Sequence, residues 1–181
     1  MDFPTIALTG DSQLTETSSR FVVTKLPPRL RAIGFDVVTV AVGGSTSRDL
    51  LDQRVPGTAD WIVVSVGTND AAPWKQVPSD EFEANCGRFL RDVGVVNRVV
   101  LGPGPIVEQG VDGERTDAAT LRYAAALERA ATATGAIFLP LPSVIDPSDL
   151  ADDGVHLSDS AYEKLVAALL AIIRSTDAGT T

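Results

Sequence analysis

The chain contains the stretch Trp61-Ile62-Val63-Val64-Ser65-Val66-Gly67-Thr68-Asn69-Asp70, in which an apolar run ends in four turn residues. β-Branched and aromatic residues favour strands, whereas glycine and small polar residues end them, so a strand is predicted from Trp61 to Val66. Four similar runs occur elsewhere in the chain. They lie at Thr5 to Leu8, Phe35 to Val42, Arg98 to Leu101 and Ala136 to Leu139.

Helical patterns fill the intervals between these predicted strands. They cover Pro28 to Ile33, Thr46 to Gln53, Ser79 to Val93, Asp117 to Thr134 and Ser158 to Arg174. The third has Asp80 and Glu81 in its first turn and the fourth is followed by Gly135, as helix ends favour. Strands that alternate with helices predict an α/β fold with a parallel sheet covered on both faces.

Length and composition are typical of one ordinary globular domain. The 181 residues are 44% hydrophobic and 22% charged, so we predict a single domain over 1–181, with a disordered tail in the last few residues. No apolar run reaches membrane-spanning length, so membrane insertion is not expected. A net charge of −9 repels phosphate backbones and makes nucleic acid an unfavourable partner.

The N-terminus and the cysteine content bear on location. Residues 1–5 show neither the basic start nor the apolar stretch of a secretory signal, which predicts a cytoplasmic protein. The only cysteine, Cys86, cannot form an internal disulfide and shares a helical face with Phe82 and Phe89, so we interpret it as a core residue. The sequence does not indicate an oligomeric state.

The only histidine, His156, follows Asp153 by three residues. A carboxylate at this distance can hold Nδ1–H of the ring and leave Nε2 free to act as a base. The alternative is that Asp153-Gly154 forms a turn and that His156 is a loop residue ahead of the last helix.

Loops after four of the predicted strands carry polar residues of the kind found in active sites. They are Gly10-Asp11-Ser12, Gly43-Gly44-Ser45-Thr46-Ser47, Gly67-Thr68-Asn69-Asp70 and the segment that ends at His156. Parallel sheets place their sites in the loops at the carboxyl ends of the strands, so these four loops are expected at one edge. Ser12 then supplies the nucleophile that the His156 segment lacks.

These residues match the needs of acyl transfer to a serine. His156 would take the Ser12 proton and return it to the leaving group, while Asp153 fixes the ring tautomer. The negative charge that develops on the substrate oxygen needs donors, and three are available: the backbone N–H of Ser12, the N–H of Gly44 and the side-chain amide of Asn69.

With these motifs the chain resembles the SGNH (GDSL-type) hydrolases, a family of esterases, lipases, thioesterases and acyltransferases. The matching blocks are Gly10-Asp11-Ser12, Val42-Gly43-Gly44-Ser45-Thr46-Ser47, Gly67-Thr68-Asn69-Asp70 and Asp153-Gly154-Val155-His156. The resemblance spans Thr5 to about Ile173 and selects Gly44 over Gly43. It implies a flavodoxin-like three-layer α/β/α fold, with a five-stranded parallel sheet in the order 2-1-3-4-5, and implies no metal or organic cofactor.

Other residues near these blocks receive weaker interpretations. Asp11 and Asp70 are read as scaffolding that holds the loops through hydrogen bonds to backbone. Trp74 and Pro105 are tentative substrate-binding residues, although Trp74 would equally suit packing on a neighbouring helix and Pro105 a plain surface loop. Gln13 and Leu14 depart from the Ile-Thr or Leu-Thr pair that more often follows the serine in the family.

Three functional hypotheses follow. The first is a serine hydrolase of small to medium acyl esters or thioesters, with a small-molecule substrate and an acyl-enzyme. The second is an acyltransferase that uses the same residues with an alcohol or amine as acceptor. The third is a binding domain without catalysis, which the full set of motif residues disfavours. A phosphate-binding fold is weaker still, because the chain lacks the glycine-rich phosphate motifs after its first strand.

Overall fold

A five-stranded parallel sheet runs through the computed structural model, which describes residues 4–17, 23, 25–75, 77–108 and 115–178. The strands are β1 (Thr5–Gly10), β2 (Asp36–Thr39), β3 (Trp61–Ser65), β4 (Asn97–Leu101) and β5 (Ile137–Leu139). They lie in the order β2-β1-β3-β4-β5, and each neighbouring pair is parallel. The predicted topology is confirmed.

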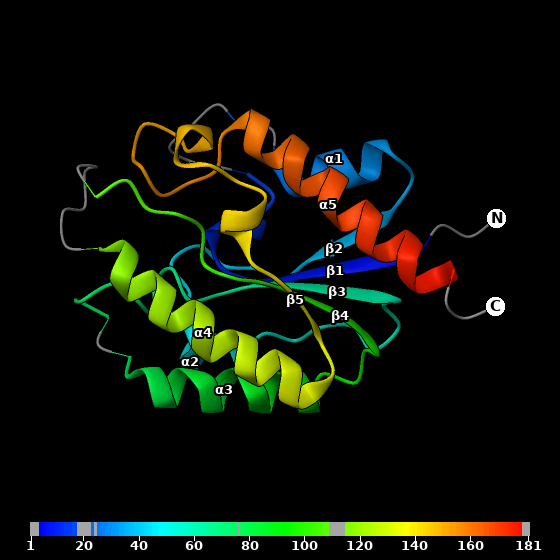
Figure 1. Cartoon of the computed structure of the whole chain (residues 1–181). Coiled ribbons are helices and arrows are strands. Elements are labelled where there is room, and N and C mark those ends of the chain that lie inside the picture. The colour runs from blue at the N-terminus through cyan, green and yellow to red at the C-terminus, as the bar shows by residue number, and fades with distance from the viewer. Residues whose placement is uncertain (1–3, 18–22, 24, 76, 109–114, 179–181) are drawn as a thin grey trace.

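Helices cover both faces of this sheet (Figure 1). One face carries α1 (Leu26–Ala32) and α5 (Asp159–Ala178), and the other carries α2 (Ser47–Leu50), α3 (Ser79–Asp92) and α4 (Asp117–Thr134). Strand side chains alternate between the two resulting cores, as the period of two requires. In β1, Ile6 and Leu8 join the core under α1 and α5, whereas Ala7 joins the core under α3 and α4.

The longer helices agree closely with their sequence signals. The α4 bounds match the prediction, with the Thr116 hydroxyl accepting from Ala119 N–H at one end and left-handed Gly135 at the other. On α3, Cys86 is buried together with Phe82 and Phe89, as expected. The last helix continues to Ala178, beyond the predicted end at Arg174, and residues 179–181 of the predicted tail lie outside the described residues.

The second predicted helix, Thr46 to Gln53, is wrong in length, because α2 ends at Leu50. Past that point the chain turns, and the Gln53 side chain bonds the end of β1 instead. Its Oε1 accepts from Gly10 N–H at 2.6 Å and its Nε2 donates to the Gly10 carbonyl at 2.8 Å. This tertiary contact fastens the strand just before the Asp11-Ser12 turn.

The second predicted strand, Phe35 to Val42, is also shorter in the structure, since β2 ends at Thr39. Sheet-like bonding nevertheless continues along the loop. The N–H groups of Val40 and Val42 donate to the carbonyls of Leu8 and Gly10. The loop that carries Gly43 and Gly44 therefore stays against the end of β1.

In the described part of the chain, three short 3-10 helices lie in the loops: η1 (Ser12–Leu14), η2 (Leu141–Ser143) and η3 (Pro147–Asp149). The first begins directly after β1, and the other two lie between β5 and the His156 segment. Among the described residues, no helix combines the length and apolar character that a membrane span requires.

Candidate active site

The end of β1 turns sharply to deliver Ser12. Gly10 has a φ of 111°, and Asp11 N–H donates to the Ser65 carbonyl at 2.9 Å. A Cβ at Gly10 would lie 1.8 Å from that same carbonyl oxygen, so only glycine fits. The turn therefore depends on the close approach of β1 to the end of β3.

Asp11 caps the short helix that carries Ser12. Its Oδ1 accepts from Gln13 N–H at 3.1 Å and from the Ser65 hydroxyl at 2.9 Å. The scaffolding interpretation of Asp11 agrees with these contacts. Because Asp11 fills the capping position, the Ser12 hydroxyl is available for another partner.

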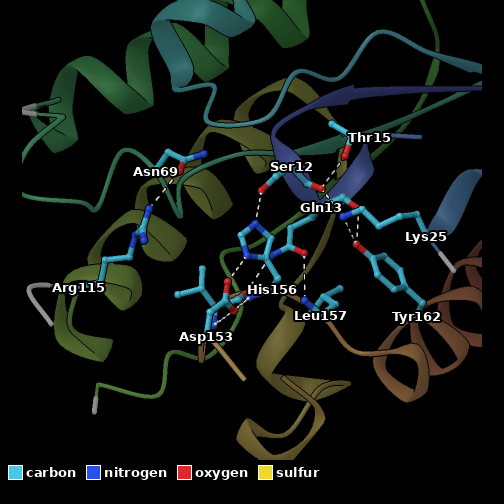
Figure 2. Close-up of polar contacts among 11 residues, drawn as sticks. Ser12, Gln13, Thr15, Lys25, Asn69, Arg115, Asp153, His156, Leu157 and Tyr162 are labelled. Carbon is cyan, nitrogen blue, oxygen red and sulfur yellow. Dashed lines mark hydrogen bonds and ion pairs between the residues drawn. The ribbon is translucent and has the colours of Figure 1, made fainter. Parts of the chain in front are cut away.

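Ser12, His156 and Asp153 form a hydrogen-bonded chain (Figure 2). Ser12 Oγ lies 2.9 Å from His156 Nε2, and His156 Nδ1 lies 2.6 Å from Asp153 Oδ2. A carboxylate offers only acceptors, so Nδ1 carries the proton and Nε2 presents its lone pair to the serine hydroxyl. The fold thus brings Ser12 into contact with His156, which lies 144 residues later in the sequence.

The turn around Gly154 fixes the Asp153 carboxylate. Asp153 Oδ1 accepts from the N–H groups of Val155 at 3.1 Å and His156 at 2.9 Å. Burial alone would raise the pKa of Asp153, but these bonds and the bond from the imidazole outweigh it, so its pKa lies below the usual value. Asp153 is therefore ionised at neutral pH. The turn that contains Gly154 also supplies the N–H groups that stabilise this negative charge.

The Gly43-Gly44 loop lies beside Ser12, and Asn69 bonds the continuation of that loop. A Cβ on Gly43 would lie 3.8 Å from Ser12 Cβ, and Gly44 adopts a left-handed φ of 78°. Asn69 Nδ2 donates to the Ser45 carbonyl at 2.9 Å, which joins the second and third loops. Ser12 N–H stands at the first position of η1, where helical N–H groups have no partner within the helix.

Asp70 strengthens the same junction between the second and third loops. Its Oδ1 accepts from Ser47 N–H at 2.8 Å, as the scaffolding interpretation requires. Burial raises the pKa of Asp70, and the hydrogen bonds from Ser47 oppose this rise. The carboxyl group thus bonds the backbone of the second loop.

The sequence pattern of the GDSL-like lipase/acylhydrolase family matches residues 7–164, which include all four blocks. The chain belongs to this family. Its fold is also that of solved family structures. A lipase/acylhydrolase from Enterococcus faecalis superposes with a TM-score of 0.80 at 20% identity, over 96% of this chain and 97% of that one.

Two further structures resemble this GDSL-like hydrolase. A putative arylesterase from Agrobacterium tumefaciens gives a TM-score of 0.76 at 22% identity, covering 96% of this chain and 99% of that one. An acetylxylan esterase from Geobacillus stearothermophilus gives 0.67 at 23% identity, covering 94% and 95%. Comparison with curated protein sequences gave no match.

Lys25 holds the Ser12 backbone, a contact that the sequence of this GDSL-like hydrolase did not predict. Its Nζ donates to the Ser12 carbonyl at 2.6 Å and to the Tyr162 hydroxyl at 2.9 Å, and that hydroxyl donates to the Gln13 carbonyl at 2.8 Å. Burial lowers the pKa of Lys25 to about 8, against the attraction of Asp11 and Asp153. A lysine at the start of a helix gives no signal of such a role.

Gln13, which departs from the residue usual in the family, links the serine to the histidine segment. Its Nε2 donates to the Val155 carbonyl at 3.1 Å, and its Oε1 accepts from Leu157 N–H at 3.4 Å. These partners flank His156 on both sides. The side chain therefore ties η1 to the segment that presents the imidazole.

The two tentative substrate-binding residues lie in different surroundings. Trp74 is half exposed, and its ring lies against the Arg115 guanidinium. Pro105 is buried and lines a cavity of about 240 Å³ whose walls do not include Ser12, Asp153 or His156. Within the described part of the chain, no three His, Cys, Asp or Glu side chains gather as metal ligands would.

Proposed function

We propose that this hydrolase is a serine esterase that cleaves carboxylic esters or thioesters of small to medium acyl groups through an acyl-enzyme. The observation that carries the proposal is the hydrogen-bonded chain from Ser12 Oγ to His156 Nε2 and from His156 Nδ1 to Asp153. These contacts suit a nucleophile, a general base and an orienting carboxylate.

In the first half-reaction, Ser12 Oγ forms a bond to the substrate carbonyl carbon while its proton passes to His156 Nε2. The carbonyl electron pair moves onto the oxygen, and Asp153 stabilises the imidazolium. The tetrahedral intermediate then collapses, the bond to the leaving oxygen or sulfur breaks, and Nε2 gives that atom the proton. The acyl group remains on Ser12.

In the second half-reaction, water replaces the leaving group. Nε2 takes a water proton as the water oxygen attacks the acyl carbon, and returns it to Ser12 Oγ when the acyl–serine bond breaks. The products are a carboxylic acid and the free enzyme. Gly44 N–H, Ser12 N–H and the Asn69 amide are proposed as donors to the oxyanion in both halves, each contributing about 3 to 4 kcal/mol if it acts as such donors usually do.

The acyl-size part of the proposal draws on the structural neighbours named as an acetylxylan esterase and an arylesterase. A series of p-nitrophenyl esters of increasing acyl length, compared by kcat/KM, tests it. We expect the shortest acyl groups to be preferred. A preference that rises steadily to long chains would contradict this part alone.

Ser12→Ala and His156→Ala test the chemistry. Each should lower kcat on p-nitrophenyl acetate by about 10⁴-fold or more, because the remaining groups cannot replace the missing one. Ser12→Ala should also abolish labelling by a fluorophosphonate. The exposed Ser175→Ala on α5 is the matched control and should retain both activity and labelling.

Two outcomes would overturn the proposal. Labelling or turnover that survives Ser12→Ala would remove the serine mechanism. A new ester or amide that forms only when an alcohol or amine is added, in place of free acid, would make the protein an acyltransferase. Mass spectrometry of the products separates these results.

A further inference from the structure

Arg115, which precedes α4, makes a contact that the proposed mechanism does not use. Its Nη2 donates to Asn69 Oδ1 at 3.2 Å. Figure 2 shows the amide nitrogen of Asn69 on the side away from Arg115. We propose that Arg115 is a positioning residue that keeps the Asn69 amide in its donor orientation, an inference that rests on the proposed function.

The chemistry of the two groups supports this assignment. The two ends of an asparagine amide have nearly the same size, and only the nitrogen can donate to an oxyanion. A guanidinium has donors alone, so the amide end that faces Arg115 must be oxygen. The Ser45 carbonyl, an acceptor, holds Nδ2 at 2.9 Å and selects the same orientation.

The side-chain nitrogen of Asn69 has one N–H left with which to bond a substrate. Nδ2 carries two hydrogens, and the Ser45 carbonyl takes one. With Oδ1 held by Arg115, rotation of the amide would place two donors face to face at Arg115 and two acceptors face to face at Ser45. Both bonds therefore oppose rotation, and the second N–H keeps one direction.

Arg115 is itself held in place. Its side chain is buried, and its Cζ lies 4.7 Å from the centre of the Trp74 ring. Such a stack between a guanidinium and an indole is favourable and restricts the plane of the guanidinium. Because Trp74 and Asn69 belong to the same loop, the stack fixes the donor relative to its acceptor.

The positive charge has a second effect on the amide. A charged donor on Oδ1 polarises the amide and makes its N–H groups stronger donors. This effect matters most when negative charge develops on the substrate oxygen, since the neutral ground state gains little from it. Arg115 should therefore influence kcat more than KM.

Arg115→Met keeps an unbranched, largely apolar side chain and removes all donors. We expect kcat on p-nitrophenyl acetate to fall about 10-fold to 100-fold with KM nearly unchanged. This loss is smaller than the loss of about 10²- to 10³-fold that follows removal of an oxyanion donor itself. Arg115→Lys retains a charged donor without the planar stack. Its kcat should lie between that of the unaltered protein and that of Arg115→Met. The exposed Arg122→Met on α4 is the matched control and should be indistinguishable from the unaltered protein.

A double-mutant cycle with Asn69→Ala separates positioning from general structural support. If Arg115 acts through Asn69, the cost of Arg115→Met should shrink to less than twofold once Asn69 is alanine. An equal cost in both backgrounds would overturn the inference. A rise in KM without a fall in kcat would also overturn it, because Arg115 would then bind substrate directly.

A boronic acid that forms a tetrahedral adduct with Ser12 gives an independent readout. Its affinity should fall with Arg115→Met by the same factor as kcat/KM, whereas unchanged affinity would contradict the proposal. If Arg115→Met does not fold, the cycle with Arg115→Lys carries the test. Full activity of Ser12→Ala would instead defeat the proposed function, so the two failures are distinguishable.

Discussion

Asp11 places a buried carboxyl group directly beside Ser12 in the chain. Burial raises the pKa of Asp11 from 3.8 to about 6, although the bonds from Gln13 and Ser65 lower it and the charge of Asp70 adds to the rise. Between these two pH values the folded chain holds a proton that the unfolded chain has released. The free energy of unfolding contributed by Asp11 therefore falls as the pH rises through this window.

Asp11→Asn should remove this dependence, because an amide keeps the acceptor oxygen and cannot ionise. Relative to the unaltered protein, the variant should gain roughly 2 kcal/mol in free energy of unfolding between about pH 4 and pH 7. Urea unfolding at several pH values measures the difference. Parallel stability curves for the two proteins would show that Asp11 does not titrate in this range.

Residue type and order suffice to predict that Ser12, Asp153 and His156 come together, but they do not identify the residues that hold them. Ser12, Asn69 and His156 were predicted because their chemistry is specific and their loops follow strands. Lys25 and Gln13 were missed as supports, since their partners Tyr162 and Val155 lie more than 100 residues away and no local pattern connects them. Their roles arise only from tertiary packing.

Among the elements, two glycines with positive φ illustrate different kinds of constraint. Gly10 ends β1 at a φ of 111° with a carbonyl oxygen 1.8 Å from the place of a Cβ. Gly135 ends α4 at a φ of 69° with nothing within 4 Å. A side chain at Gly10 is excluded by contact with a neighbouring strand, whereas a side chain at Gly135 is disfavoured only by the left-handed backbone conformation.

Gly10→Ala and Gly135→Ala should therefore differ sharply. Gly135→Ala should cost about 1 to 2 kcal/mol in free energy of unfolding and leave kcat unchanged. Gly10→Ala should cost more and should also lower kcat, because β1 must move and carry Ser12 with it. Chemical unfolding and p-nitrophenyl acetate turnover measure both. Equal costs, or full activity in Gly10→Ala, would contradict this view of the turn.

Element bounds were predicted well where local signals are strong. Caps define α4 at Thr116 and Gly135, and its predicted range was correct. The short α2 was predicted too long, because the bonds of the Gln53 side chain to β1 outweigh local helix preference. Helix η1 was not predicted, since three residues carry no periodic signal.

For the whole molecule, the sheet separates two buried cores. Leu127 of α4 lies in the core on one face, Leu165 of α5 lies in the core on the other, and both are fully buried. The two leucines belong to different clusters of packed side chains. Their contributions to stability should consequently be independent.

Leu127→Ala and Leu165→Ala should each lower the free energy of unfolding by about 2 to 5 kcal/mol, through lost burial and a residual cavity. In the double variant the two costs should add to within about 0.5 kcal/mol. Urea unfolding followed by circular dichroism measures all four proteins. A large departure from additivity would mean that the two layers rearrange together.

The Ser12–His156 contact also bears on synthesis of the chain. Asp153 and His156 are three residues apart and belong to one turn, but Ser12 is made 144 residues before His156. On the ribosome, Ser12 emerges long before His156 has been translated. Under the proposed mechanism, a nascent chain cannot turn over esters before His156 has left the ribosome, so the onset of turnover would report that the two ends of the chain have come together.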